Sequence, residues 1–253
     1  MAFSLLSLIF TTTASPAIEG VPENIHAWEN LWTSVLMKNV NEAGQIDFAS
    51  LSRNHADLDR VVAFIAANDP VSQPAKFPGR EARLAYYINT YNALAMIGVV
   101  DAGIPDSFGG LRKIPFFYFR TFAIGGKSIS LYSLENDVIR PIGEPRIHFA
   151  LNCMVVSCPR LPRIAFTANK LEMQLEEAAS TFIGESRNLR VDMDKQELWL
   201  SEIFKFYTED FIASEPSLVA YINRYRSNKI PAEFEIRYLD YDWTVNKRKT
   251  SEK

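Results

Sequence analysis

A long helical pattern over residues 81–100 is the feature that most constrains how this chain can fold. Its apolar side chains recur every three or four residues, at Leu84, Tyr87, Tyr91, Leu94 and Ile97. This spacing predicts a helix with a continuous apolar stripe, which other elements must cover. The chain has 253 residues, of which 47% are hydrophobic, and this is enough to build that core within one domain.

Two asparagines, Asn89 and Asn92, lie on the face of this helix beside the stripe. Asparagine is a poor helix former in such positions because its side chain competes for backbone hydrogen bonds. One interpretation is that both amides satisfy buried backbone groups of a neighbouring strand. The other is that they line a site and contact a substrate.

The rest of the chain mixes helices and strands without a regular strand–helix–strand repeat. We expect helices over residues 26–40, 56–67 and 131–140, and hairpins over residues 121–131 and 189–200. Residues 146–152 alternate in polarity and predict a strand that carries His148 and Asn152 on one face. This mixture favours an α+β domain with a mixed or antiparallel sheet and several packed helices.

The two ends of the chain differ from its body. Residues 1–17 hold a short apolar run followed by small residues, the layout of a signal peptide, which predicts a periplasmic or secreted protein. We expect a helical lead-in over residues 18–80, the main domain over 81–245 and a basic tail over 246–253. Neither this run nor any other is long enough to span a bilayer, so we expect no stable membrane insertion, and the net charge of −3 gives no sign of nucleic-acid binding.

The segment from residue 135 to residue 159 concentrates the side chains that could perform chemistry. A thiol becomes nucleophilic beside a base, and a histidine base needs a carboxylate or amide to hold its tautomer. On an ideal strand His148 and Asn152 point the same way and Cys153 points the opposite way, so Cys158 is the better partner for His148. Glu135 or Asn152 would orient the imidazole.

A second interpretation of the same segment involves no catalysis. The chain has two cysteines, Cys153 and Cys158, and an even count in an exported protein favours a disulfide. In that case Arg140 and Arg146, with His148, would hold an anionic ligand, or the two arginines would pair with Glu135. We expect no metal site and no cofactor, because the cysteine spacing fits no closed zinc pattern. The ligand itself, a small molecule or a peptide, stays unknown.

The segment over residues 146–159 (RIHFALNCMVVSCP) resembles the signature of the family called domain of unknown function 547. Blocks over residues 87–94, 130–140, 200–211 and 241–243 also resemble that family, although Met154 stands where the family usually has a small residue. Members of that family occur as exported bacterial proteins and as domains in plant proteins, so the resemblance implies a protein of one of these kinds whose activity is not settled. It also suggests a distant similarity to papain-like and transglutaminase-like folds, which place Cys before His in the chain.

Three functions are therefore open. The first is a Cys/His-dependent hydrolase or acyl transferase that acts on an amide or thioester, with Cys158 as the nucleophile. The second is a non-catalytic thiol, disulfide or anion-binding protein. The third is a structural interaction domain in which the motif only stabilises the fold.

Overall fold

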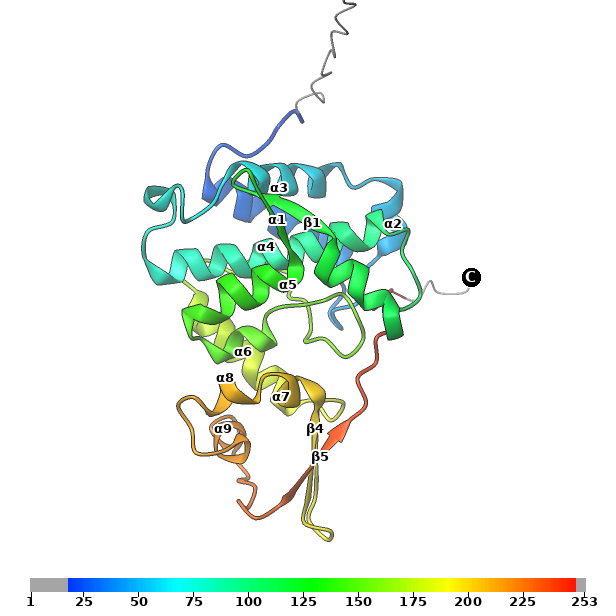
Figure 1. Ribbon diagram of the computed structural model, residues 1–253, viewed down its shortest axis with the longest axis vertical. Helices are drawn as coiled ribbons and strands as arrows, with labels where there is room; N and C mark the ends of the chain where they lie inside the picture. The colour runs from blue at the N-terminus through cyan, green and yellow to red at the C-terminus, as the bar shows by residue number, and fades with distance from the viewer. Residues whose placement is uncertain (1–17, 249–253) are drawn as a thin grey trace, which may run out of the picture.

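The computed structural model describes residues 18–248, and the predicted signal peptide over 1–17 lies outside them. The described chain forms an elongated α+β molecule with a helical upper part and a smaller lower part that holds a three-stranded sheet (Figure 1). Each part has its own cluster of buried apolar side chains. Among the described residues, no helix combines the length and apolar character needed to cross a membrane.

The upper part is built around helix α4 (Gly79–Asp101), which confirms the helix expected over residues 81–100. Helices α1 (Ile25–Asn39), α2 (Phe48–Arg53) and α3 (Ala56–Ala67) pack on it, so the predicted lead-in shares one core with α4. Trp28 of α1 stacks on Phe64 of α3, with ring centroids 5.4 Å apart, and its indole nitrogen donates to the Val61 carbonyl. These buried aromatic contacts fix the helices against one another.

A hairpin and a chain of short helical turns follow α4. Strands β1 (Thr121–Ile124) and β2 (Lys127–Ser130) pair antiparallel across the glycine turn, as the sequence predicts. Between α4 and this hairpin lie the short helices η2 (Gly110–Arg112) and η3 (Pro115–Phe119), whereas the short helix η1 (Pro74–Lys76) precedes α4. After them come α5 (Leu131–Ser133), η4 (Leu134–Ile139) and η5 (Arg140–Ile142). The Ser130 side chain caps α5 by accepting from the Ser133 amide, which confirms the predicted cap.

The prediction of a strand over residues 146–152 is wrong. Residues Pro145–Phe149 form a 3-10 helix, η6, which the Glu144 side chain begins by accepting from the Arg146 amide. The alternation has a different cause: Ile147 is buried in the upper core and Phe149 in the lower core. The side chains of residues 147–152 are all buried, so the polar His148 and the apolar residues on either side of it face different interior surroundings and not two faces of a sheet.

The lower part packs three short helices and a sheet against helix α6 (Leu171–Gly184). Strand β4 (Glu197–Ser201) pairs antiparallel with β3 (Leu189–Asp192) and parallel with β5 (Glu235–Leu239). The helices are α7 (Glu202–Phe206), α8 (Thr208–Ile212) and α9 (Leu218–Asn223). The Phe149 ring lies among their aromatic side chains, so η6 joins the two parts.

After β5 the chain returns to the upper part, as Figure 1 shows in red. Val245 forms a bridge with Val155, and Lys247 forms one with Ile46. The first described residues of the predicted tail are thus hydrogen-bonded to the body, and residues 249–253 lie outside the described chain. This return places Tyr241 and Trp243 beside the segment that carries the two cysteines.

Candidate functional site

A cavity of about 420 Å³ opens between η6, α7, the cysteine-containing loop and the returning C-terminal segment. Its wall combines aromatic rings with a few polar groups. The polar and sulfur-bearing residues that line it are Lys113, Glu135, Asn136, Arg140, His148, Cys153 and Cys158. The aromatic residues are Tyr91, Phe117, Tyr118, Tyr132, Phe206, Tyr207, Tyr241 and Trp243. A small number of polar groups converging in an aromatic cavity is typical of a ligand site.

His148 is held in this wall by a carboxylate that comes from a distant part of the chain. Its Nε2 atom lies 2.7 Å from Oδ2 of Asp210 in α8, and its ring stacks on Tyr207 with centroids 3.8 Å apart. Since a carboxylate only accepts, Nε2 carries the proton in this contact. The Nδ1 atom is then the basic nitrogen of the neutral ring, and it is buried without a hydrogen-bond partner in the described chain.

Asp210 also binds Arg140, which lies on the same side of the cavity. The guanidinium donates from Nε and Nη2 to the two carboxylate oxygens at 2.8 and 2.9 Å, and Nη1 donates to Asn136 at 2.7 Å. Burial alone would raise the pKa of Asp210, but the hydrogen bonds and charges of His148 and Arg140 outweigh it and hold that pKa well below its usual value. Asp210 is therefore an anion over the whole neutral range.

Glu135 does not contact the imidazole, although the sequence offered it as the orienting group. One of its carboxylate oxygens accepts from the Tyr207 hydroxyl at 2.5 Å. Burial and the nearby charge of Glu135 raise the pKa of both Tyr207 and Tyr91 well above the usual range, so both hydroxyl groups stay protonated. Glu135 thus forms a polar wall with two phenols, and Asp210 takes the role that the sequence assigned to Glu135 or Asn152.

Cys153 and Cys158 are joined by a disulfide, and both line the cavity that His148 lines. The Cys158 sulfur is buried and accepts from the Cys153 amide at 3.1 Å, whereas Cys153 is partly exposed. The Tyr241 hydroxyl lies 3.4 Å from both sulfurs. Of the two sulfurs, that of Cys153 is the more accessible, although the sequence favoured Cys158 as the reactive one.

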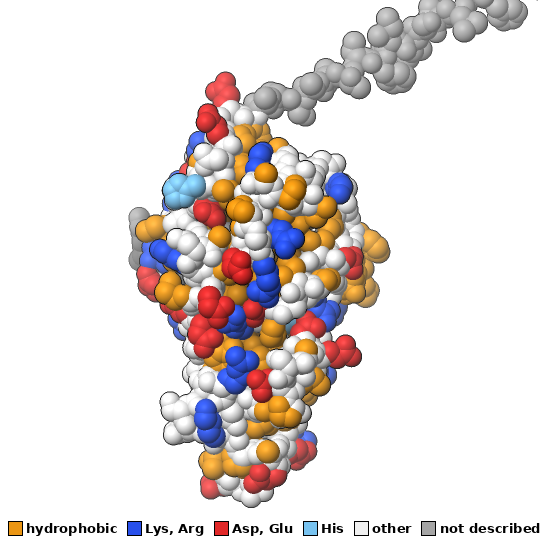
Figure 2. All heavy atoms as spheres, turned by 90° about the vertical axis from the view of Figure 1, so that its left-hand side faces the viewer, with side chains coloured by type: hydrophobic (Ala, Val, Ile, Leu, Met, Phe, Trp, Pro, Cys, Tyr) orange, Lys and Arg blue, Asp and Glu red, His pale blue; other side chains and the backbone are white. Residues whose placement is uncertain are grey.

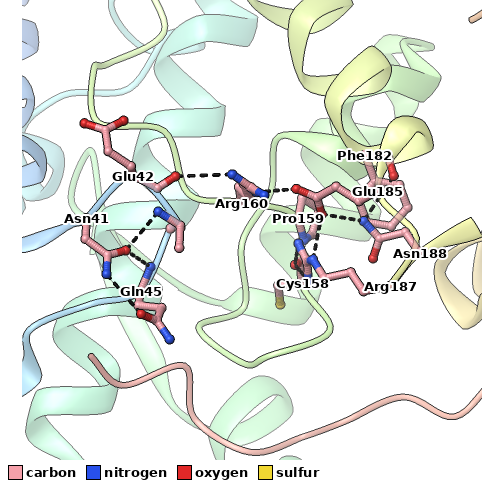
Figure 3. A network of polar contacts seen from close by, with 12 residues as sticks. Asn41, Glu42, Gln45, Cys158, Pro159, Arg160, Phe182, Glu185, Arg187 and Asn188 are labelled. Atoms are coloured by element: carbon pink, nitrogen blue, oxygen red, sulfur yellow. Dashed lines mark hydrogen bonds and ion pairs between the residues drawn. The ribbon is translucent and has the colours of Figure 1, made fainter. Parts of the chain in front are cut away.

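The loop of residues 152–159 is fixed on both sides. Inside the loop, Asn152 accepts from the Met154 amide at 2.7 Å and donates to the Pro159 carbonyl. On its outer side, Arg187 donates to the Cys158 carbonyl at 3.3 Å, as Figure 3 shows, and Arg160 forms an ion pair with Glu185. The Asn152 side chain is therefore engaged in loop structure and does not hold the imidazole.

Asn89 and Asn92 are also engaged with backbone groups. Asn89 exchanges two hydrogen bonds with Phe166, at 2.7 and 3.0 Å. Asn92 donates to the Ala150 carbonyl at 3.0 Å and accepts from the Asn152 amide at 2.7 Å. Neither residue lines the cavity, and neither segment that they hold is a strand, although a strand was expected over residues 146–152 where Asn92 binds.

Replacing Asn92 with alanine is expected to lower the free energy of unfolding by about 2 kcal/mol, because the Ala150 carbonyl and the Asn152 amide lose their buried partner. Urea unfolding followed by circular dichroism measures this loss. The exposed Asn228 provides the control, and its replacement by alanine should change the stability by less than about 0.5 kcal/mol. Equal effects of the two substitutions would show that the Asn92 amide does not hold this loop.

Arg146 lies outside the cavity wall, contrary to the role in ligand binding suggested by the sequence. It donates to Glu144 at 2.7 Å and to Glu172 of α6 at 2.6 Å. Its charge is therefore already compensated. On the face shown in Figure 2, acidic and basic side chains are interspersed in the same way across the middle of the molecule.

Sequence reasoning missed Asp210 and Tyr207 as partners of His148, and Tyr241 as a neighbour of the two sulfurs. They lie more than fifty residues from their partners along the chain, so no local spacing connects them. The available signal was the set of blocks over residues 200–211 and 241–243, which contain all three residues.

Comparison with known proteins gives one match. Residues 74–183 match the model of a family described as "Protein of unknown function, DUF547". This range covers α4, Glu135, His148 and both cysteines, whereas Asp210 and Tyr241 lie beyond it. No curated protein and no solved structure shows a significant match.

Proposed function

We propose that this chain, whose residues 74–183 belong to the family described as "Protein of unknown function, DUF547", is a cysteine-dependent enzyme that cleaves or transfers an acyl group. The substrate would be an amide or a thioester. The observation that carries this proposal is the state of His148, whose Nε2 is bound to Asp210 while Nδ1 is buried and unpartnered in a wall shared with two sulfurs. A base oriented by a carboxylate activates a thiol that comes within hydrogen-bond reach of it. In the disulfide form Nδ1 has no such partner among the described residues, so the proposal requires a sulfur to approach Nδ1 after reduction.

The reaction requires the disulfide to be reduced, because only a thiolate is nucleophilic. His148 would take the proton of the attacking thiol at Nδ1 and later give it to the leaving group. Exposure favours Cys153 as the attacking residue, since the Cys158 side chain is buried. Asp210 stabilises the imidazolium that forms in this step, because its lowered pKa keeps it charged.

The position of the Tyr241 hydroxyl also supports acyl-group chemistry at the two sulfurs. Burial, followed by the charge of Glu135, raises the pKa of Tyr241, so its hydroxyl keeps its proton. This hydroxyl lies 3.4 Å from each sulfur and can therefore donate to an oxyanion that forms on a carbonyl attacked there.

Alkylation with an iodoacetamide probe tests the proposal without a known substrate. After reduction, Cys153 should be labelled near neutral pH, and replacing His148 with alanine should slow the labelling by about tenfold because less thiolate is present. Peptide mass spectrometry identifies the labelled cysteine. His55, which pairs with Asp59 and does not line the cavity, provides the control, and its replacement by alanine should leave the rate unchanged. Failure of either cysteine to react after reduction would contradict the proposal, and so would a rate that does not depend on His148.

The disulfide itself favours a second candidate, a binding protein in which the Cys153–Cys158 bond braces the cavity wall. Export to the periplasm or the medium, which we propose from residues 1–17, would keep that bond oxidised. The structure gives less support to an anionic ligand, because Arg140 already binds Asp210 and Arg146 binds two glutamates. Retention of the disulfide in the native protein under mild reduction would favour this second function.

A further inference from the structure

The Cys153–Cys158 disulfide presents one of its sulfurs to the cavity more openly than the other. Cys158 is 2% exposed, whereas Cys153 is partly exposed, and both residues line the cavity. A thiol that enters the cavity therefore reaches the Cys153 sulfur more readily. Since thiol–disulfide exchange takes place by attack on one sulfur of the bond, this asymmetry decides which sulfur is attacked and which one leaves.

Two hydrogen-bond donors lie where negative charge would form on the leaving Cys158 sulfur. The Cys153 amide donates to that sulfur at 3.1 Å, and the Tyr241 hydroxyl lies 3.4 Å from it. Hydrogen bonds to an anion are stronger than those to a neutral acceptor, so both donors stabilise the Cys158 thiolate more than the disulfide. A thiolate that is stabilised in this way is a better leaving group.

The backbone of Cys158 is fixed on both sides of its sulfur. Its carbonyl accepts from Arg187 at 3.3 Å, a contact that Figure 3 shows, and its amide donates to the Val155 carbonyl at 3.1 Å. The Cys158 sulfur therefore stays beside Cys153 after the bond between them breaks. From there it can return and displace a group that is bound to Cys153.

The wall beside the disulfide offers apolar surface to an incoming thiol. Phe206 is 47% exposed, and its ring centroid lies 5.7 Å from that of Tyr241. In the same wall, the partly exposed rings of Tyr118 and Tyr132 stack on one another with centroids 4.4 Å apart. These rings suit a thiol whose carrier has apolar groups of its own.

We propose that this chain exchanges its Cys153–Cys158 disulfide with thiols that carry apolar groups. A substrate thiolate bonds to the Cys153 sulfur, the S–S bond breaks, and its electron pair stays on Cys158. A second substrate thiolate then bonds to the substrate sulfur of this mixed disulfide and releases the Cys153 thiolate. Two substrate thiols are thereby oxidised to one disulfide, and their two protons pass to the two reduced cysteines. Oxidised glutathione, a small disulfide, restores the bond by the reverse steps.

This activity starts from the oxidised chain, so it does not rest on the acyl-transfer proposal. It also yields the reduced form on which that proposal depends. The two proposals have separate readouts, because acyl chemistry is tested by labelling a chemically reduced chain and by the effect of His148. Either proposal can therefore fail while the other stands.

Reduction of the oxidised full chain by a tripeptide of phenylalanine, cysteine and phenylalanine tests the exchange. Blocking with N-ethylmaleimide at successive times, followed by intact mass spectrometry, counts the thiols that form. Tyr241→Phe should slow the reduction by about tenfold, because the leaving thiolate loses a hydrogen bond. Tyr238→Phe, at a tyrosine that does not line the cavity, should leave the rate unchanged. Equal rates for these two variants would overturn the proposal.

The exposed ring of Phe206 tests the choice of substrate. Phe206→Ala should slow the reaction with the tripeptide by about fivefold, because an aromatic contact is lost, and should leave the reaction with reduced glutathione unchanged. Phe119→Ala, at an exposed ring that does not line the cavity, should change neither rate. Equal slowing of both thiols by Phe206→Ala, or no slowing of either, would contradict the preference for apolar thiols.

Trapping of the mixed disulfide identifies the attacked sulfur. Reduced Cys158→Ser, mixed with the disulfide of the tripeptide, should accumulate a mixed disulfide on Cys153. Cys153→Ser, which keeps only the buried sulfur, should react at least about tenfold more slowly. The unchanged reduced chain should pass directly to its own disulfide. Faster reaction of Cys153→Ser, or a mixed disulfide that persists in the unchanged chain, would show that the two sulfurs do not have these roles.

Discussion

Replacing Asp210 with alanine is expected to lower the free energy of unfolding by about 3 kcal/mol, which would make it one of the most damaging single changes in this chain. Asp210 accepts from Arg140 and from His148, and the His148 side chain is only 1% exposed. The substitution leaves a half-buried guanidinium and a buried ring N–H without an acceptor. Removing one member of a buried pair is costly because its partners stay desolvated.

Urea unfolding at neutral pH measures this effect, and Asp101 offers a matched control. Asp101 also pairs with an arginine, Arg120, but its side chain is 47% exposed. Its replacement by alanine should cost less than about 0.5 kcal/mol, as for most exposed pairs. If Asp210→Ala costs no more than Asp101→Ala, Asp210 does not hold His148 and Arg140 in place.

The effect of Asp210 should also depend on pH. Its pKa is lower in the folded chain than in the unfolded chain, where it is about 3.9. Below that value the unfolded state binds a proton more readily, so stability is lost as the pH falls. We expect the difference in unfolding free energy between the unchanged chain and Asp210→Ala to be constant between about pH 5 and 7. It should shrink below about pH 4, and a difference that grows on acidification would contradict the assigned sign.

Local patterns predicted the parts of this fold that depend on neighbouring residues. The α4 helix follows from its apolar spacing, and the β1–β2 hairpin follows from its glycine pair. Both are set by backbone preferences and by side chains a few positions apart. The cap formed by Ser130 is equally local.

The parts that were missed depend on contacts between distant segments. The polarity of residues 146–152 alternates as in a strand, and nothing within those residues shows that they form η6 and lie between two cores. For the same reason the candidate site was assembled with the wrong carboxylate. Glu135 is near His148 in sequence, but Asp210, 62 residues away, is the group in contact. The histidine and the two cysteines could be found from sequence, whereas the residue that orients the histidine required the fold.

The position of η6 between the cores leads to the second large effect. Replacing Phe149 with alanine is expected to lower the free energy of unfolding by about 4 kcal/mol. Phe149 is 1% exposed and lies 4.9 Å from Phe182 and 5.4 Å from Phe211, measured between ring centroids. The aromatic rings around it come from four different helices, α6, α7, α8 and α9, so the lower core cannot close around the space that is left.

Two further variants distinguish this cavity effect from the general loss of an aromatic ring. Phe149→Leu fills most of the space and should cost about 1.5 kcal/mol, while Phe119→Ala, at a position that is 74% exposed, should cost less than about 0.5 kcal/mol. Phe211 also meets the His148 ring edge-on at 5.4 Å, so loosening it should reach the candidate site. Thiol labelling of reduced Phe149→Ala should therefore slow under conditions in which the variant is still folded. If stability falls but labelling does not change, the lower core and the His148 site are independent, and the aromatic cluster serves the fold alone.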